Sequence, residues 1–150
     1  MKKLLFLLFY LPLFVFGQHI SIKDIRSISS TDSETFEIFC MKRDYKFHSI
    51  DKDDNGVYDG LTMRYFDGTT TRYVTYYNYF FNLKKCFNYQ TSSASDLLKI
   101  YEELKSLGFK LIGRSQQTDH VEKNYENNYT KEKINIFLFK TTTEIGYMIE

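Results

Sequence analysis

The sequence is short of the residue patterns that most often carry catalysis. Its 150 residues include no tryptophan, and its three histidines are too scattered to indicate a zinc site. It also lacks Gly-x-Ser-x-Gly, His-Glu-x-x-His and a phosphate-binding glycine-rich loop. No complete catalytic motif is present. Carboxylates are numerous, however, and their spacing alone neither selects nor excludes a catalytic pair, so a small hydrolase stays open.

An excess of charge of one sign is absent as well. The chain has 20 basic and 19 acidic side chains, for a formal net charge of +1. Without residues 1–17, which carry two lysines, 18 basic side chains face the same 19 acidic ones. A near-neutral domain has no electrostatic reason to bind nucleic acid or an anionic membrane. We therefore expect no nucleic-acid partner.

Proline is nearly absent, and the one proline, Pro12, lies in the longest hydrophobic run. Residues 4–16 form an unbroken apolar run after a basic start, with small or β-branched residues at the positions that signal peptidase reads. A helix of about 13 residues spans roughly 20 Å, too short for a hydrocarbon core of about 30 Å. We predict a cleavable signal peptide over residues 1–17. Residues 18–150 would then be a single exported domain, secreted or periplasmic and not embedded in the membrane.

Two later segments have the hydrophobic spacing of amphipathic helices. Residues 95–107 have apolar side chains every three or four positions, with serines at the start and a glycine after the end. A counterpart spans residues 32–44, where Thr31 and Glu34 are spaced as a capping box. Four isoleucines between residues 20 and 28 fit either an extension of this counterpart helix or an edge strand.

Each helix is followed by segments with the period of two that strands require. The predicted strands are residues 45–50, 57–66, 72–81 and 86–89, then 109–114, 121–129, 133–140 and 145–149. One helix and four strands therefore occur twice, over about 31–90 and 93–150. A unit of about 60 residues buries little surface alone, so the two should share one core. We predict an α+β fold in which tandem αββββ repeats form one antiparallel sheet of about eight strands, with two helices on one face.

Tandem helix-plus-four-strand units in a small exported domain resemble the β-lactamase inhibitor protein fold. The resemblance covers the whole chain after residue 17 as an arrangement of elements, without a shared sequence motif. It implies that the open face of the sheet is a protein-binding surface. It transfers no residue roles, because function does not follow from fold alone.

The chain has only two cysteines, Cys40 and Cys86, and an even pair in an oxidising compartment predicts a disulfide. The bond would tie the first helix to the last strand of the same half. Closing a loop of about 45 residues would constrain the unfolded chain by roughly 3–4 kcal/mol in the entropy model. The alternative is two buried thiols that pack as small hydrophobic side chains.

Residues 51–59 match the front of a calcium-binding EF-hand loop, and calcium is the one cofactor that the sequence suggests. Oxygen-bearing side chains fall at positions 1, 3, 5 and 9 of the loop: Asp51, Asp53, Asn55 and Asp59. Position 12, however, is Thr62, which cannot supply the bidentate carboxylate. Strands are also expected on both sides of the loop. The other interpretation is therefore a β-hairpin tip built on an Asn-Gly turn.

Aromatic residues are plentiful, and they are densest in the predicted strand 72–81. Strand alternation places Tyr73, Tyr77 and Tyr79 on one face of this strand. One face should pack under the helices, and the other can form an exposed aromatic patch of the kind that anchors protein interfaces. Ordinary cross-strand pairing of aromatic side chains is the alternative.

These observations favour an exported, non-enzymatic binding module. It would engage a protein in the cell envelope or outside the cell, as an inhibitor or accessory factor, with Tyr73, Tyr77 and Tyr79 as contact residues. The alternatives are a small secreted hydrolase, for example one that acts on glycans, and a calcium-stabilised structural module of the cell surface.

Overall fold

The computed structural model describes residues 19–29, 31–52, 58–77 and 86–148, with the backbone alone at 58, 59, 86 and 148. Helices and strands follow one another in the order α1 (Ile22–Ser29), α2 (Ser33–Met41), β1 (Lys46–Lys52), β2 (Tyr58–Phe66), β3 (Thr71–Tyr77), β4 (Cys86–Thr91), α3 (Ala94–Ser106), β5 (Phe109–Gln116), β6 (His120–Asn127), β7 (Lys133–Phe139) and β8 (Thr143–Met148).

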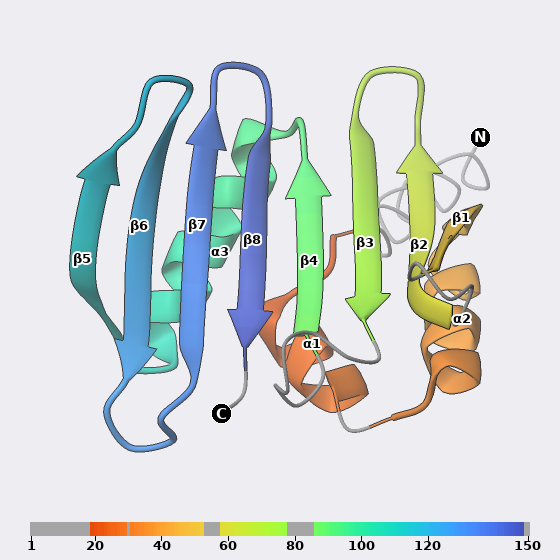
Figure 1. The fold of residues 1–150 in the computed structure, drawn as a ribbon, viewed down its shortest axis with the longest axis horizontal. Helices are drawn as coiled ribbons and strands as arrows, with labels where there is room; N and C mark the ends of the chain where they lie inside the picture. The colour runs from red at the N-terminus through yellow and green to blue at the C-terminus, as the bar shows by residue number, and fades with distance from the viewer. Residues whose placement is uncertain (1–18, 30, 53–57, 78–85, 149–150) are drawn as a thin grey trace, which may run out of the picture.

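The eight strands form one open antiparallel sheet in the order β1-β2-β3-β4-β8-β7-β6-β5. The first four strands make one meander and the last four another, and β4 pairs with β8 where the meanders meet (Figure 1). The buried residues of all three helices belong to one hydrophobic core on one side of the sheet. The predicted α+β class and the single antiparallel sheet are confirmed.

The isoleucine-rich segment forms a helix of its own, α1, instead of extending α2 or pairing as a strand. Ile22, Ile25 and Ile28 share one helical face, and all three are buried. Ser21 and Asp24 form a reciprocal cap: the Ser21 Oγ accepts from the Asp24 N–H at 3.0 Å, and the Ser21 N–H donates to the Asp24 carboxylate at 3.0 Å. The core is therefore covered by three helices, where the sequence predicted two.

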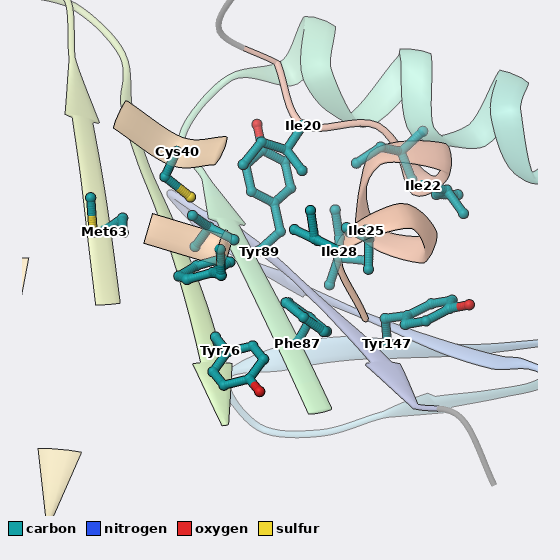
Figure 2. Packing of buried hydrophobic residues seen from close by; sticks show 14 of the residues in the cluster. Ile20, Ile22, Ile25, Ile28, Cys40, Met63, Tyr76, Phe87, Tyr89 and Tyr147 are labelled. Atoms are coloured by element: carbon teal, nitrogen blue, oxygen red, sulfur yellow. The ribbon is translucent and has the colours of Figure 1, made fainter. Parts of the chain in front are cut away.

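Aromatic side chains fill the space between these helices and the sheet. Figure 2 shows the isoleucines of the amino-terminal segment gathered near Phe87 and Tyr89 of β4. On the α2 side, the Phe36 ring stacks on Tyr76 with centroids 5.4 Å apart and lies 5.9 Å from Phe87. Because consecutive strand residues alternate between faces, these inward rings leave the intervening residues on the opposite side of the sheet.

Both edge strands contain an irregularity. The pairing of β1 with β2 shifts register between Phe47 and Ser49, and that of β5 with β6 shifts between Leu111 and Gly113. Such bulges add one residue on one strand and increase the local twist. They interrupt the row of free backbone groups at each edge and so discourage unspecific strand pairing.

Helix α1 should contribute directly to stability, because its apolar face is part of the core. We expect Ile25→Ala to lower the free energy of unfolding by about 2–5 kcal/mol, since the substitution leaves a cavity under the sheet. Denaturant titration measures the change. Lys23→Ala, an exposed position on the same helix, is the control and should stay within about 0.5 kcal/mol of the wild type. Equal effects of the two substitutions would show that α1 is not packed in the core.

Candidate functional site

The face of the sheet opposite the helices carries the aromatic residues that the sequence singled out. In β3, Val74 and Tyr76 are buried beneath the helices, so Tyr73 and Tyr77 lie on the other face, where each is partly exposed. Tyr79 lies outside the described residues. We call this surface the open face and define it by Thr62, Arg64, Tyr73, Thr75, Tyr77, Asn88, Gln90, Glu122, Asn124, Asn135, Phe137, Glu144 and Gly146.

A row of small and amide side chains crosses the open face at right angles to the strands. Direct cross-strand partners make up this row: Ser49, Thr62, Thr75, Asn88, Gly146, Asn135, Asn124 and Gly113. The next row along the strands carries larger groups: Arg64, Tyr73, Gln90, Glu144, Phe137, Glu122 and Ser115. The face therefore places a line of short side chains beside a line of aromatic and charged ones.

Aromatic rings on this side of the sheet contact histidines in both halves. The rings of His48 and Tyr73 have centroids 5.1 Å apart. In the second half, the His120 ring lies 5.6 Å from Phe137 and 5.1 Å from Phe139. The aromatic patch predicted from the sequence covered β3 alone and left out this second group. The alternation of residues 133–140 was the signal for it, because Ile134 and Ile136 are buried and the residues between them face outward.

Charges of both signs stand on the open face. The Arg64 guanidinium lies 5.9 Å from the centre of the Tyr73 ring, near the β1 edge. In the other half, the Glu144 carboxylate accepts a hydrogen bond from Gln90 Nε2 at 3.0 Å, and Glu122 lies two strands further on. Complementary charges steer and orient protein association. The arrangement suits a partner with an acidic group toward β2 and a basic group toward β6 and β8.

A buried ion pair lies on the helix side of the sheet, around Asp96 in the first turn of α3. The carboxylate accepts hydrogen bonds from Arg72 Nε at 2.6 Å and from the hydroxyls of Tyr89 at 3.0 Å and Thr91 at 2.9 Å. Burial opposes ionisation, but the hydrogen bonds from Arg72 and Thr91 outweigh it and lower the pKa of Asp96 below its usual 3.8. The cluster ties α3 to β3 and β4.

A second interior carboxylate, Glu132, is held in a similar way. Arg26 of α1 donates to it through Nε at 2.8 Å and through Nη2, and the Tyr147 hydroxyl donates to the same carboxylate. Burial opposes ionisation here too, yet the hydrogen bonds from Thr130, Tyr147 and Arg26 lower the pKa of Glu132 below its usual 4.5. Asp96 and Glu132 thus both bind structural partners on the helix side.

Removing the charge of Asp96 should strongly destabilise the fold, because it leaves the Arg72 guanidinium buried without its counter-ion. We expect Asp96→Asn to lower the free energy of unfolding by about 3–5 kcal/mol in denaturant titrations at neutral pH. Glu102→Gln, an exposed carboxylate of the same helix, is the matched control and should change it by less than about 0.5 kcal/mol. A small effect of Asp96→Asn would contradict the ion pair.

The same carboxylates should make the fold sensitive to acid. A carboxyl whose folded-state pKa is lowered adds stability above its unfolded pKa, and that stability is lost as the pH falls through the folded-state value. For Asp96 and Glu132 the loss therefore begins near pH 4.5 to 3.8 and continues below it. Denaturant titrations across this range should give a steeper decline for the wild type than for Asp96→Asn. Parallel declines would argue against the Asp96 contribution.

The calcium-like loop falls mostly outside the described residues. Asp51 is exposed in β1, Asp53 and Asn55 are not described, and Asp59 lies in β2 without a described side chain. Position 12 of the motif, Thr62, is a paired residue of β2 whose hydroxyl forms a hydrogen bond with that of Thr75 at 3.0 Å. Among the residues that the structure describes, no three His, Cys, Asp or Glu side chains gather as metal ligands.

The strands on both sides of this loop favour the hairpin-tip interpretation, so we expect EDTA to leave the Tm unchanged. A ligand that binds only the native state must raise its stability. A calcium-binding loop would therefore give a Tm that falls on addition of EDTA and recovers with excess Ca²⁺. Differential scanning fluorimetry with each addition measures this. Asp53→Asn, which removes one of the possible oxygen ligands, should behave like the wild type if the loop is a plain turn.

Cys40 is a free, completely buried cysteine in the structure, so the Cys40–Cys86 disulfide predicted from the sequence is not formed there. Cys40 lies on the helix side of the sheet. Cys40 is part of the same buried cluster there as Phe87 and Tyr89 of β4. The side chain of Cys86 is not described. Burial raises the pKa of the Cys40 thiol to about 12.

Alkylation distinguishes the free thiol from the disulfide. We expect iodoacetamide to leave Cys40 unmodified in the native protein, because the thiolate is the reactive form and burial suppresses it. In denaturant without reductant, mass spectrometry should show both cysteines alkylated. Labelling that appears only after a reductant is added would establish the disulfide instead.

Comparison with known proteins found no match, either to a family model, to a curated protein or to a solved structure. Within the described part of the chain, no helix is both long and apolar enough to cross a membrane.

Proposed function

We propose that this protein is an exported, non-enzymatic module that binds another protein through the open face of its sheet. One observation carries the proposal. The helices α1, α2 and α3 pack on one side of the sheet (Figure 1), and strand alternation places Tyr73, Tyr77 and Phe137 on the opposite side. Aromatic side chains supply large contact areas at interfaces while losing little conformational freedom. An inhibitor or accessory factor is the role that this surface fits.

The width of the sheet supports a protein as the partner. Neighbouring strands lie about 4.8 Å apart, so an eight-stranded sheet offers a surface on the order of 30 Å wide. A surface of that width suits the area of a standard protein interface. Charges of both signs at separate places, Arg64 over β2 and Glu122 over β6, favour a partner that docks in one orientation.

The rival interpretations have less support. A glycan hydrolase uses a pair of carboxylates. Of the four described carboxylates with lowered pKa values, Asp96 and Glu132 are occupied by arginine and tyrosine partners on the helix side, and Asp67 and Asp119 are hydrogen-bonded to nearby residues in the sequence. A calcium-stabilised structural module depends on the loop near Asp51, whose twelfth position is held in β2. Export to the periplasm or the cell exterior remains part of the proposal and rests on residues 1–17.

We also propose that the two halves are copies of one αββββ unit. Three pairs of buried residues, Phe36 and Ile100, Cys40 and Leu104, Tyr45 and Phe109, are each 64 residues apart. The bulges of β1 and β5 fall at residues 48 and 112, again 64 apart. Because Leu104 occupies the position equivalent to Cys40 in the second half, we expect Cys40 to pack as a small hydrophobic side chain.

Substitution of the open-face tyrosines tests the proposed function. The first step is to recover the partner by cross-linking the purified protein in an envelope or culture-medium fraction of the source cell. We expect Tyr73→Ala and Tyr77→Ala to weaken binding of that partner at least about tenfold, because truncation of an aromatic anchor costs on the order of 1–2 kcal/mol or more. Biolayer interferometry measures the change in Kd.

Tyr129→Ala is the matched control for this experiment. Tyr129 is 94% exposed in the turn between β6 and β7 and is not part of the open face. The Tyr129→Ala variant should bind the partner as tightly as the wild type does. The proposal fails if all three tyrosine variants bind equally well, or if the captured protein binds a variant with Phe137→Asp on the open face as tightly as the wild type.

A further inference from the structure

The two edges of the sheet expose large apolar side chains next to charges that form no ion pair with another described residue. One surface, the α2–β1 edge, comprises Glu34, Glu37, Met41, Asp44, Phe47 and Ile50; the other, the β5 edge, comprises Lys110, Leu111, Ile112 and Arg114. Phe47 is 56% exposed and Leu111 is 52% exposed. Clustered exposed apolar side chains mark interaction surfaces in soluble domains. The first surface carries three carboxylates, with the exposed Lys46 beside them, and the second carries two cations.

Two pockets at the α2–β1 edge share Glu37 and Phe47 among their lining residues. One, of about 310 Å³, is lined by Ser33, Glu34, Glu37, Phe47, Ile50 and Leu61. The other, of about 350 Å³, is lined by Glu37, Met41, Asp44, Tyr45, Lys46 and Phe47. Both pockets combine apolar walls with carboxylates, and Lys46 is the one basic lining residue. Their chemistry fits an apolar side chain that lies next to a cation.

The bulge in β1 creates this pocketed edge. In a regular strand, residues three apart point to opposite faces. The bulge at residue 48 adds one residue, so Phe47 pairs with Met63 while Ile50 pairs with Leu61. Both partners are buried on the helix side of the sheet. Phe47 and Ile50 are therefore brought to the same side, next to the carboxylates of α2.

The bulge in β5 has the same consequence at the opposite edge. Leu111 pairs with Tyr125 and Arg114 pairs with Lys123. Both partners contact the Tyr101 ring of α3, so they lie on the helix side. Leu111 and Arg114 therefore both lie on the helix side of β5, as Phe47 and Ile50 do on β1.

Because the number of strands is even, the β5 edge of one copy can lie antiparallel against the β1 edge of another. All seven neighbouring pairs are antiparallel, so β1 and β5, the first and last of eight strands, run in opposite directions. A copy placed alongside in the same orientation keeps its helices on the same side. It then presents its β5 antiparallel to β1 of the first copy, with helix-side residues facing helix-side residues.

We propose that the protein associates head to tail, with the β5 edge of one copy docked on the α2–β1 edge of the next. Leu111 sits beside Phe47. Because the two strands run antiparallel, Arg114 then lies toward the start of β1, beside Asp44. The bulges interrupt backbone pairing at both edges, so these side chains rather than a continuous strand ladder hold the contact. The interface is heterologous and therefore extends into chains or closes into rings, depending on the rotation between copies. The open face stays free in this arrangement.

Sedimentation of the purified protein tests the association. We expect the weight-average mass to rise with concentration between about 1 μM and about 1 mM, the range of a modest interface. The association constant should fall at least tenfold for Phe47→Glu and for Leu111→Glu, and it should fall in high salt because ions screen the charges. Both residues are more than half exposed, so neither substitution should unfold the chain. Circular dichroism of each variant checks this.

Mixing the two variants gives the decisive result. Phe47→Glu keeps an intact β5 edge and Leu111→Glu keeps an intact α2–β1 edge, so the mixture should form 1:1 dimers and nothing larger. Leu98→Glu, at a 64% exposed leucine of α3, is the control and should associate as the wild type does. A monomer at all concentrations would overturn the proposal. So would a mixture that stays monomeric, or association that Leu98→Glu weakens as much as Phe47→Glu.

Discussion

The structure depends on the pairing of β4 with β8. Each four-stranded meander alone would leave its last strand as a free edge and would bury too little apolar surface to fold stably. Pairing Asn88 with Gly146 and Gln90 with Glu144 joins the two meanders into one sheet and aligns their buried faces under α1, α2 and α3. The same pairing makes the opposite side continuous, so that residues from both halves form one open face. It also leaves β1 and β5 as the two edges.

A core rich in tyrosine explains the interior carboxylates. A buried tyrosine hydroxyl needs a hydrogen-bond partner, and Tyr45, Tyr65, Tyr76, Tyr89 and Tyr147 are all buried. Tyr89 donates to Asp96 and Tyr147 donates to Glu132. Each carboxylate then needs a cation, which Arg72 and Arg26 provide. The perturbed pKa values of these carboxyl groups thus follow from the composition of the core and do not indicate catalysis.

The two faces and the two edges divide the surface into different roles. The helix side is filled by packing and ion pairs, and the open face carries aromatic groups among short polar ones. At the edges, the bulges limit backbone pairing and bring Phe47 and Leu111 into exposed positions beside charges. A protein that binds a partner on one face can therefore associate through its edges without the two contacts competing for the same residues.

The sequence by itself determined the elements whose signals are local. Period-two alternation placed all eight strands, and hydrophobic spacing placed α2 and α3, because these patterns act over a few residues. The predicted Thr31–Glu34 capping box of α2 was wrong, since Asp32 caps that helix and accepts from the Thr35 N–H. The isoleucine segment stayed ambiguous, although its Ser21–Asp24 capping pair was a readable local sign of α1.

Only the tertiary structure decided which distant side chains pair and on which side of the sheet they lie. The partners Arg72 and Asp96 are 24 residues apart and Arg26 and Glu132 are 106 apart, and nothing in the local sequence couples them. Likewise, the side of the sheet on which Cys40 lies depends on how helix and strand pack, so the even count of cysteines could suggest a disulfide but not the geometry that would allow it.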